Sequence, residues 1–118
     1  MTLAGSSAGL ETLLAEDGVV EVPFAPPGFP SRFEGPAAVA ARRTLMAGLF
    51  RFTAMRDVVV HQTTDPEVAF VEYELEAVRV ADGVRAAAPF AVLIRVRDGQ
   101  VVLWREYQDS AAMARFVS

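Results

Sequence analysis

The stretch DGQVVLWREYQD, residues 98–109, decides the fold. Asp98-Gly99 is a strong signal for a two-residue hairpin turn. The residues after it are rich in β-branched and aromatic side chains, and so is the segment before it. We therefore predict an antiparallel hairpin with strands over 85–97 and 100–108. Asp109 or Ser110 can cap a short helix over 111–117.

The rest of the chain extends this hairpin into a larger sheet. Turns are expected at 64–67 and at Asp82-Gly83, since both contain the residues that turns prefer. The other elements expected from helical and strand periodicity are a short helix over 8–16 closed by Asp17-Gly18, a strand around 19–22, a proline-rich loop over 23–30, a helix over 36–50, and strands over 55–64 and 68–80. Four consecutive strands, with helices gathered ahead of them, predict an α+β fold.

Composition limits the kinds of site that the chain can build. Its 118 residues fit one domain, which we place at 8–118 after a flexible tail over 1–7. The absence of cysteine excludes thiol chemistry, and a single histidine excludes a histidine-rich metal site. No metal or cofactor is therefore expected. A net charge of −4 disfavours nucleic acid, no apolar run reaches membrane-spanning length, and no signal peptide is visible, so a cytoplasmic protein is expected.

Two segments resemble proteins of the NTF2-like superfamily, and SnoaL-like and ketosteroid isomerase-like proteins in particular. LLAEDGVVEVPFAPPG, residues 13–28, is similar to the start of their sheet, and residues 98–109 are similar to their final hairpin and to limonene epoxide hydrolase. The resemblance implies a cystatin-like cone: a strongly bent, mostly antiparallel sheet wrapped around helices and an apolar pocket. It also implies that the outer sheet face makes a homodimer. The first helix is shortened in this chain.

Strand alternation assigns the faces of the sheet. Glu72, Glu74 and Glu76 are expected outside, in a solvated or ion-paired row with Arg95 and Arg105 as candidate partners. Inward positions are expected at Val71, Tyr73, Leu75 and Ala77, then at Ala88, Phe90, Val92, Ile94 and Val96, and, by the resemblance, at Val102, Trp104, Glu106 and Gln108. The predicted ligand pocket comprises Val22, Phe24, Tyr73, Leu75, Phe90, Val92, Trp104 and Gln108.

Glu106 is the candidate catalytic residue. A lone carboxylate beside Trp104, Phe90 and Tyr73 would be desolvated, as a general acid or base near neutrality needs to be. Glu106 falls where the resemblance places the water-activating aspartate of limonene epoxide hydrolase. The alternative is that Glu106 only orders the core by bonding Tyr73 or the backbone.

Other polar residues are weaker candidates. Arg42 and Arg43 are expected to face solvent, although a long arginine could reach over the pocket mouth. The face of His61 is left open by the pattern. The loop from Phe24 to Pro30 is either a pocket rim or a rigid connection.

This chain lacks the residues with which the resembled enzymes carry out their known reactions. By the resemblance, Val22 occupies the position where ketosteroid isomerase has its proton-shuttling aspartate. The position of that enzyme's second oxyanion acid falls near Val92, which is apolar. By the resemblance, Tyr73 and Leu75 are the nearest matches to the positions where the epoxide hydrolase has an arginine and a second aspartate. Two hypotheses remain: a pocket protein that binds an apolar small molecule, and an enzyme that uses Glu106 as a general acid or base on an apolar carbonyl or cyclic substrate.

Overall fold

A computed structural model describes residues 9–117, so the predicted tail over 1–7 lies outside the described residues. The elements in chain order are the 3-10 turn η1 (Leu10–Thr12), β1 (Leu14–Glu21), β2 (Arg32–Glu34), α1 (Gly35–Leu49), β3 (Phe50–Gln62), β4 (Val68–Arg79), β5 (Arg85–Arg97), β6 (Gln100–Gln108) and α2 (Ser110–Val117). None of the helices within 9–117 has the length and apolar character needed to cross a membrane.

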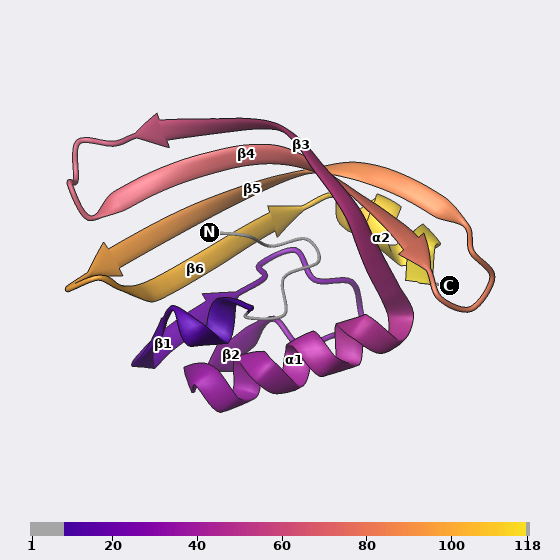
Figure 1. Ribbon diagram of the computed structural model, residues 1–118, viewed down its shortest axis with the longest axis horizontal. Coiled ribbons are helices and arrows are strands. Elements are labelled where there is room, and N and C mark those ends of the chain that lie inside the picture. The colour runs from indigo at the N-terminus through magenta and orange to yellow at the C-terminus, as the bar shows by residue number, and fades with distance from the viewer. Residues whose placement is uncertain (1–8, 118) are drawn as a thin grey trace.

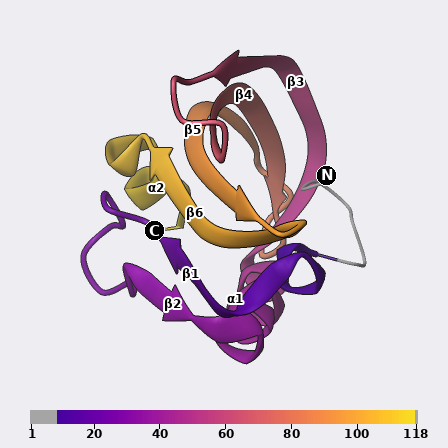
Figure 2. The ribbon, with the colours of Figure 1, turned by 90° about the vertical axis from the view of Figure 1, so that its left-hand side faces the viewer.

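The strands form one six-stranded sheet in the order β2-β1-β6-β5-β4-β3. Strands β1 and β6 run parallel, and every other neighbouring pair is antiparallel. The sheet is strongly bent: β3 to β6 arch over the molecule, and β1, β2 and α1 close it from below (Figures 1 and 2). The α+β cone predicted from the sequence is therefore confirmed.

The hairpin over 98–109 forms as expected. Strands β5 and β6 have the predicted bounds, and Arg97 lies opposite Gln100. Asp98 has φ 53° and Gly99 has φ 76°. Positive φ at both central residues is typical of the type I′ turn, whose twist matches that of the flanking strands.

The short helix predicted over 8–16 is wrong in the described part of the chain. Of the described residues in this segment, only those of η1 (Leu10–Thr12) are helical, and β1 already begins at Leu14. Leu14 pairs with Val101, and the Leu13 carbonyl accepts a hydrogen bond from the Val101 amide. Pairing with β6 thus overrides a spacing that involves few residues. The expected stop at Gly18 is instead a strand irregularity, where a Cβ atom would lie 2.8 Å from the Val101 carbonyl oxygen.

Two further elements differ from expectation. Strand β2 lies at the end of the proline-rich loop and pairs with β1, a contact too short to leave a periodic signal. Strand β3 begins at Phe50 rather than Met55, because Phe50–Phe52 pair with the end of β4. Helix α1 matches the predicted 36–50 within one residue at each end.

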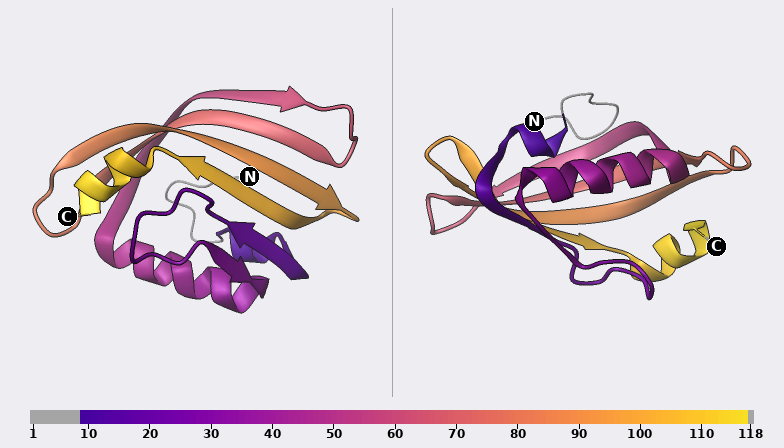
Figure 3. Two further views of the ribbon diagram at one scale, coloured as in Figure 1. Left: turned by 180° about the vertical axis from the view of Figure 1, so that it is seen from behind. Right: turned by 90° about the horizontal axis from the view of Figure 1, so that it is seen from below.

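Helix α1 lies across the concave face of the sheet (Figure 3). Val39 is its one buried residue, whereas Leu45 and Leu49 of the expected apolar stripe are exposed. The buried core lies instead at the β1 end of the concave face and comprises Leu10, Leu14, Val20, Val39, Tyr73, Phe90, Val92, Ile94, Val101 and Trp104. Beyond this core, α1 and the sheet enclose a cavity.

Candidate functional site: the cavity between α1 and the sheet

The cavity has a volume of about 630 Å³. Its walls come from α1, from the concave side of β4, β5 and β6, from the proline-rich loop and from α2. Most of the lining side chains are aliphatic or aromatic. Charged lining residues are few: Glu11, Arg42, Arg43, Arg51 and Glu106. A cavity of this size and character is typical of a small-molecule site.

An ion pair crosses the cavity from α1 to β6. Arg42 Nη2 donates to Glu106 Oε2 at 3.0 Å. Trp104 Nε1 donates to the other carboxylate oxygen, Oε1, at 3.3 Å. The Arg42 guanidinium also lies 5.3 Å from the centre of the Phe33 ring, within cation–π distance.

Local structure places each member of this cluster. Trp104 and Glu106 are two residues apart on β6, so strand alternation puts both on the concave face. Arg42 follows the buried Val39 by one helical turn and therefore points toward the sheet. Arg42 therefore does not face solvent but takes the alternative position over the pocket, and Glu106 is not a lone carboxylate.

Tyr73 adds a second polar group to the same wall. Its side chain is buried, at 5% exposure, and its ring stacks on Phe90 with centroids 5.7 Å apart. Burial, and then the negative charge of Glu106, raise the pKa of the Tyr73 phenol far above its ordinary value. The hydroxyl is therefore a neutral hydrogen-bond donor. Within residues 9–117, no group bonds it.

A second ion pair lies at another part of the cavity lining. Arg43 of α1 pairs with Glu11 of η1. The other Glu11 oxygen, Oε2, is buried and has no hydrogen-bond partner in the described chain. The Arg43 side chain is 46% exposed, as predicted for a residue that faces solvent, whereas that of Glu11 is 13% exposed. Local periodicity does not indicate this pair, because the two residues lie far apart in the chain.

The comparisons with known proteins fit this arrangement. Residues 3–104 match the SnoaL-like domain. The chain belongs to the SnoaL-like family. An uncharacterized PhzA/B-like protein of Pseudomonas aeruginosa is 35% identical over 105 residues, which cover 87% of this chain and 72% of that protein. The uncharacterized protein YesE of Bacillus subtilis is 26% identical over 92 residues, 78% of this chain; the chain spans 63% of YesE, less than two thirds of its length.

Solved structures share the fold of this SnoaL-like chain. A proposed isomerase from Bacillus subtilis superposes with a TM-score of 0.83 at 24% identity, over 89% of this chain and 76% of that one. A proposed polyketide cyclase from Xanthomonas campestris gives 0.77 at 25% identity, over 92% and 82%. A phenazine biosynthesis-related protein from Pseudomonas aeruginosa gives 0.75 at 18% identity, over 91% and 71%.

The structure of this SnoaL-like protein brings most of the predicted pocket residues to the cavity. The lining includes Val22, Tyr73, Leu75, Phe90, Trp104, Glu106 and Gln108. Two predictions are wrong. Phe24 is exposed, and its ring lies 5.8 Å from that of Tyr107 on the convex face. Val92 is fully buried in the core and does not line the cavity.

Strand alternation also fails at one place on β6. The register between β5 and β6 shifts between Arg95 and Val96, so that Val101 lies opposite Val96 and Leu103 opposite Arg95. Val101 is consequently buried in the core with Trp104, in the position expected for Val102. Val96, expected inside, is exposed. A bulge of this kind has no signal in a single sequence.

The glutamates of β4 lie outside and are paired, as predicted, but with other partners. Glu74 and Glu76 bind Arg56 of β3, and Glu72 lies 2.6 Å from His61. His61 therefore occupies the convex face. Arg95 and Arg105, the expected partners, bind other carboxylates.

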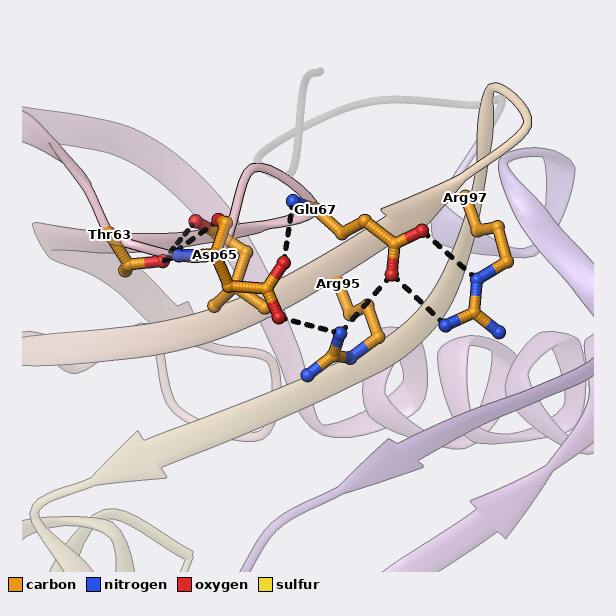
Figure 4. A network of polar contacts seen from close by, with 6 residues as sticks. Thr63, Asp65, Glu67, Arg95 and Arg97 are labelled. Atoms are coloured by element: carbon orange, nitrogen blue, oxygen red, sulfur yellow. Dashed lines mark hydrogen bonds and ion pairs between the residues drawn. The ribbon is translucent and has the colours of Figure 1, made fainter.

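Arg95 belongs to a polar network at the turn between β3 and β4 (Figure 4). It binds Asp65 and Glu67, and Glu67 also binds Arg97. Arg105 binds Glu21 of β1 at 2.9 Å. These ion pairs fix the turn and the sheet, and none of their residues lines the cavity. Among residues 9–117, no group of carboxylates and histidine has the arrangement of a metal site.

Proposed function

We propose that this SnoaL-like protein binds an apolar small molecule in the cavity between α1 and the sheet. The observation that carries the proposal is the distribution of polarity. Arg42, Tyr73 and Glu106 line one part of a cavity of about 630 Å³. Its remaining walls are largely apolar apart from Arg51 and the Glu11–Arg43 pair. A few convergent polar groups in an apolar pocket orient a ligand, while the apolar walls supply most of its affinity.

The relatives support a small molecule as the ligand. One structure with this fold is a phenazine biosynthesis-related protein, and another is a proposed polyketide cyclase. Both descriptions concern small organic molecules. We extend that ligand class, and no particular compound, to this chain.

A second candidate function is catalysis by Glu106 as a general acid or base. The observation that favours it is the position of its carboxylate. Each oxygen accepts one hydrogen bond, from Arg42 or from Trp104, and the group lines the cavity. A carboxylate has about four lone-pair sites, so two remain to exchange a proton with a ligand. Arg42 and Trp104 would hold the carboxylate in one orientation for that transfer.

Trp104 provides the test of binding, because it is the one tryptophan of the sequence and lines the cavity. A panel of apolar ketones, phenols and hydrocarbons is titrated while Trp104 emission and the melting temperature are recorded. We expect saturable changes in emission and a raised melting temperature for some members. If no member changes either quantity, the proposed function is wrong.

Glu106→Gln separates the two candidate functions, with Glu74→Gln on the convex face as a matched control. For a binding protein, Glu106→Gln changes ligand affinity and no ligand is converted by either form. For an enzyme, ligands that the wild type converts are still bound by Glu106→Gln but are no longer converted. Product analysis by mass spectrometry distinguishes these results.

A further inference from the structure

Small side chains form the floor of the cavity beyond Tyr73. Strands β4 and β5 pair in register there: Tyr73 with Phe90, Leu75 with Ala88, and Ala77 with Ala86. Leu75, Ala77, Ala86 and Ala88 all line the cavity. Three alanines in this small area leave space that larger side chains would fill.

This floor extends along the direction of the strands. From Phe90 to Ala86, β5 advances about 13 Å, because a strand rises about 3.3 Å per residue. Phe52 of β3 lies beside Ala77, and Gln108 of β6 lies beside Phe90, and both also line the cavity. The alanine positions therefore form the path along the strands from Tyr73 toward Ala86.

The two ends of the floor differ in exposure. At one end Tyr73 and Trp104 are 5% and 2% exposed. At the other end Leu45 and Val80, which also line the cavity, are each 56% exposed. The cavity therefore opens near the turn between β4 and β5, and Tyr73 lies at its inner part.

Tyr73 indicates what chemistry the inner part accepts. Its hydroxyl lines the cavity wall, is a neutral donor, and is bonded by no group of the described chain. A hydroxyl that lines the cavity without a partner in the described chain can donate a hydrogen bond to an acceptor oxygen on a ligand. Arg42, which uses Nη2 for Glu106, has further N–H groups on the same wall.

We propose that the ligand is an elongated molecule with an acceptor oxygen at or near one end, bound with that oxygen at Tyr73 and with its apolar part along Ala88 and Ala86 toward the opening. This inference rests on the proposed function and adds a ligand class, an orientation and a length limit. Ala88 and Ala86 are then the residues that determine the length of ligand accepted.

The test uses unbranched methyl ketones of increasing length, with calorimetry on the full chain. In the wild type, each added methylene tightens binding about fourfold while the chain still gains buried contacts, and then the affinity reaches a plateau. Ala88→Leu, which fills the floor near Tyr73, is expected to move the plateau to shorter ketones and to leave the shortest unaffected. Ala86→Leu, nearer the opening, is expected to move the plateau to a ketone length between those of Ala88→Leu and the wild type. It replaces Ala88→Leu in the test if that variant does not fold.

Two further variants make the test specific. Ala91→Leu places the same substitution on the convex face of the same strand and should leave the plateau unchanged. Tyr73→Phe removes one oxygen atom and is expected to weaken ketones about threefold to tenfold. Unbranched alkanes of equal length should bind Tyr73→Phe as well as or better than they bind the wild type.

The outcomes distinguish this inference from the proposed function. If the wild type binds ketones but Ala88→Leu and Ala86→Leu leave the plateau in place, the length-selecting floor is wrong and the binding function stands. If Tyr73→Phe weakens ketones and alkanes equally, Tyr73 does not hold the oxygen. If no ketone of any length binds the wild type while other apolar ligands do, the elongated ligand with a terminal acceptor oxygen is rejected. Failure of every ligand rejects both proposals.

Discussion

Arg42 of α1 and Glu106 of β6 bind each other across the cavity, with 3.0 Å between Nη2 and Oε2. Their side chains are 21% and 12% exposed, so the pair is largely shielded from solvent. It is the direct polar link between the helix and the sheet wall at this point. Removing either partner leaves the other charge partly buried without compensation.

We expect Arg42→Met to lower the free energy of unfolding by about 1–3 kcal/mol, since it leaves the Glu106 carboxylate with one donor, Trp104. Glu106→Gln should cost less, about 1 kcal/mol, because the amide oxygen can still accept a hydrogen bond. Urea denaturation measures both. In the double variant the two losses should not add, since the residues are in contact.

Glu34→Gln is the matched control for Glu106→Gln. Glu34 binds Arg32 at 2.9 Å, but its side chain is 70% exposed. Exposed pairs contribute about 0–1 kcal/mol, so this variant should be close to the wild type. A loss at Glu34 as large as that at Glu106 would show that enclosure in the cavity does not strengthen the pair.

The hairpin could be predicted from sequence because its determinants are local. Asp98-Gly99 specifies the turn, and strand periodicity on each side predicts the bounds of both strands. The face of Trp104 and Glu106 follows from the resemblance, because the register between β5 and β6 shifts between Arg95 and Val96. Strand alternation identified Tyr73 as a concave-face residue. Long elements such as α1 have a periodic pattern over many residues, and the predicted bounds of α1 agree with the structure to within one residue.

The partners of charged residues could not be predicted in this way. Arg42 and Glu106 are 64 residues apart, and their contact depends on the rotation of α1 over the sheet. Arg95 was expected to pair with the β4 glutamates, but the turn over 64–67 brings Asp65 and Glu67 within its reach. The spacing of the leucines near residue 13 indicates a helix, but the parallel pairing with β6 makes Leu14 the start of a strand. Each of these errors comes from tertiary contacts that local pattern does not contain.

Gly99 tests the turn that starts the last strand. Its φ of 76° is unfavourable for a residue with a Cβ, although no atom lies within 4 Å of the place a Cβ would take. We therefore expect Gly99→Ala to cost about 1–2 kcal/mol through backbone strain.

Gly48→Ala is the control for this substitution. Gly48 lies in α1, and a Cβ there also meets no atom within 4 Å. Because alanine favours the helix, this variant should gain about 0.5–1 kcal/mol. Thermal melts compare the two. Equal effects at both positions would show that the left-handed conformation of residue 99 is not what matters.

The network at the turn between β3 and β4 should make stability depend on pH in the acid range. The Glu67 N–H, and then Arg95, lower the pKa of Asp65 below 3.8. Arg97, and then Arg95, lower the pKa of Glu67 below 4.5. The unfolded chain binds protons at these ordinary values, so the stabilisation is fully present above them and is lost as the pH falls through the lower folded values.

The measurement compares melting temperatures of the wild type and of Asp65→Asn/Glu67→Gln. We expect a constant difference near neutrality that shrinks below about pH 4.5 and also shrinks in high salt, since the network is exposed. A difference that does not change with pH would mean that these carboxylates contribute no charge-dependent stability.

We propose that the protein forms a homodimer through the convex face of the sheet. Leu93, Leu103 and Tyr107 lie on this face in partial exposure, and α1 covers the opposite face (Figure 3). Leu93 lies between Phe70 and Arg105, and Leu103 lies beside Val19, so apolar and charged groups alternate across the face. In a two-fold contact each apolar group meets the same patch on the partner, and Arg105, already paired with Glu21, can remain at the rim.

Leu103→Arg tests this dimer by placing a charge within the patch of each subunit. Light scattering at micromolar concentration should give the mass of a dimer for the wild type and of a monomer for Leu103→Arg, because two like charges would meet across the two-fold axis without compensation. Val60→Arg is the control, since Val60 is 62% exposed on the edge strand β3 and its register partner Val71 lies on the concave face. It should remain a dimer. A monomeric wild type rejects the interface, and dissociation by Val60→Arg as well would show that dissociation does not depend on the convex face around Leu103.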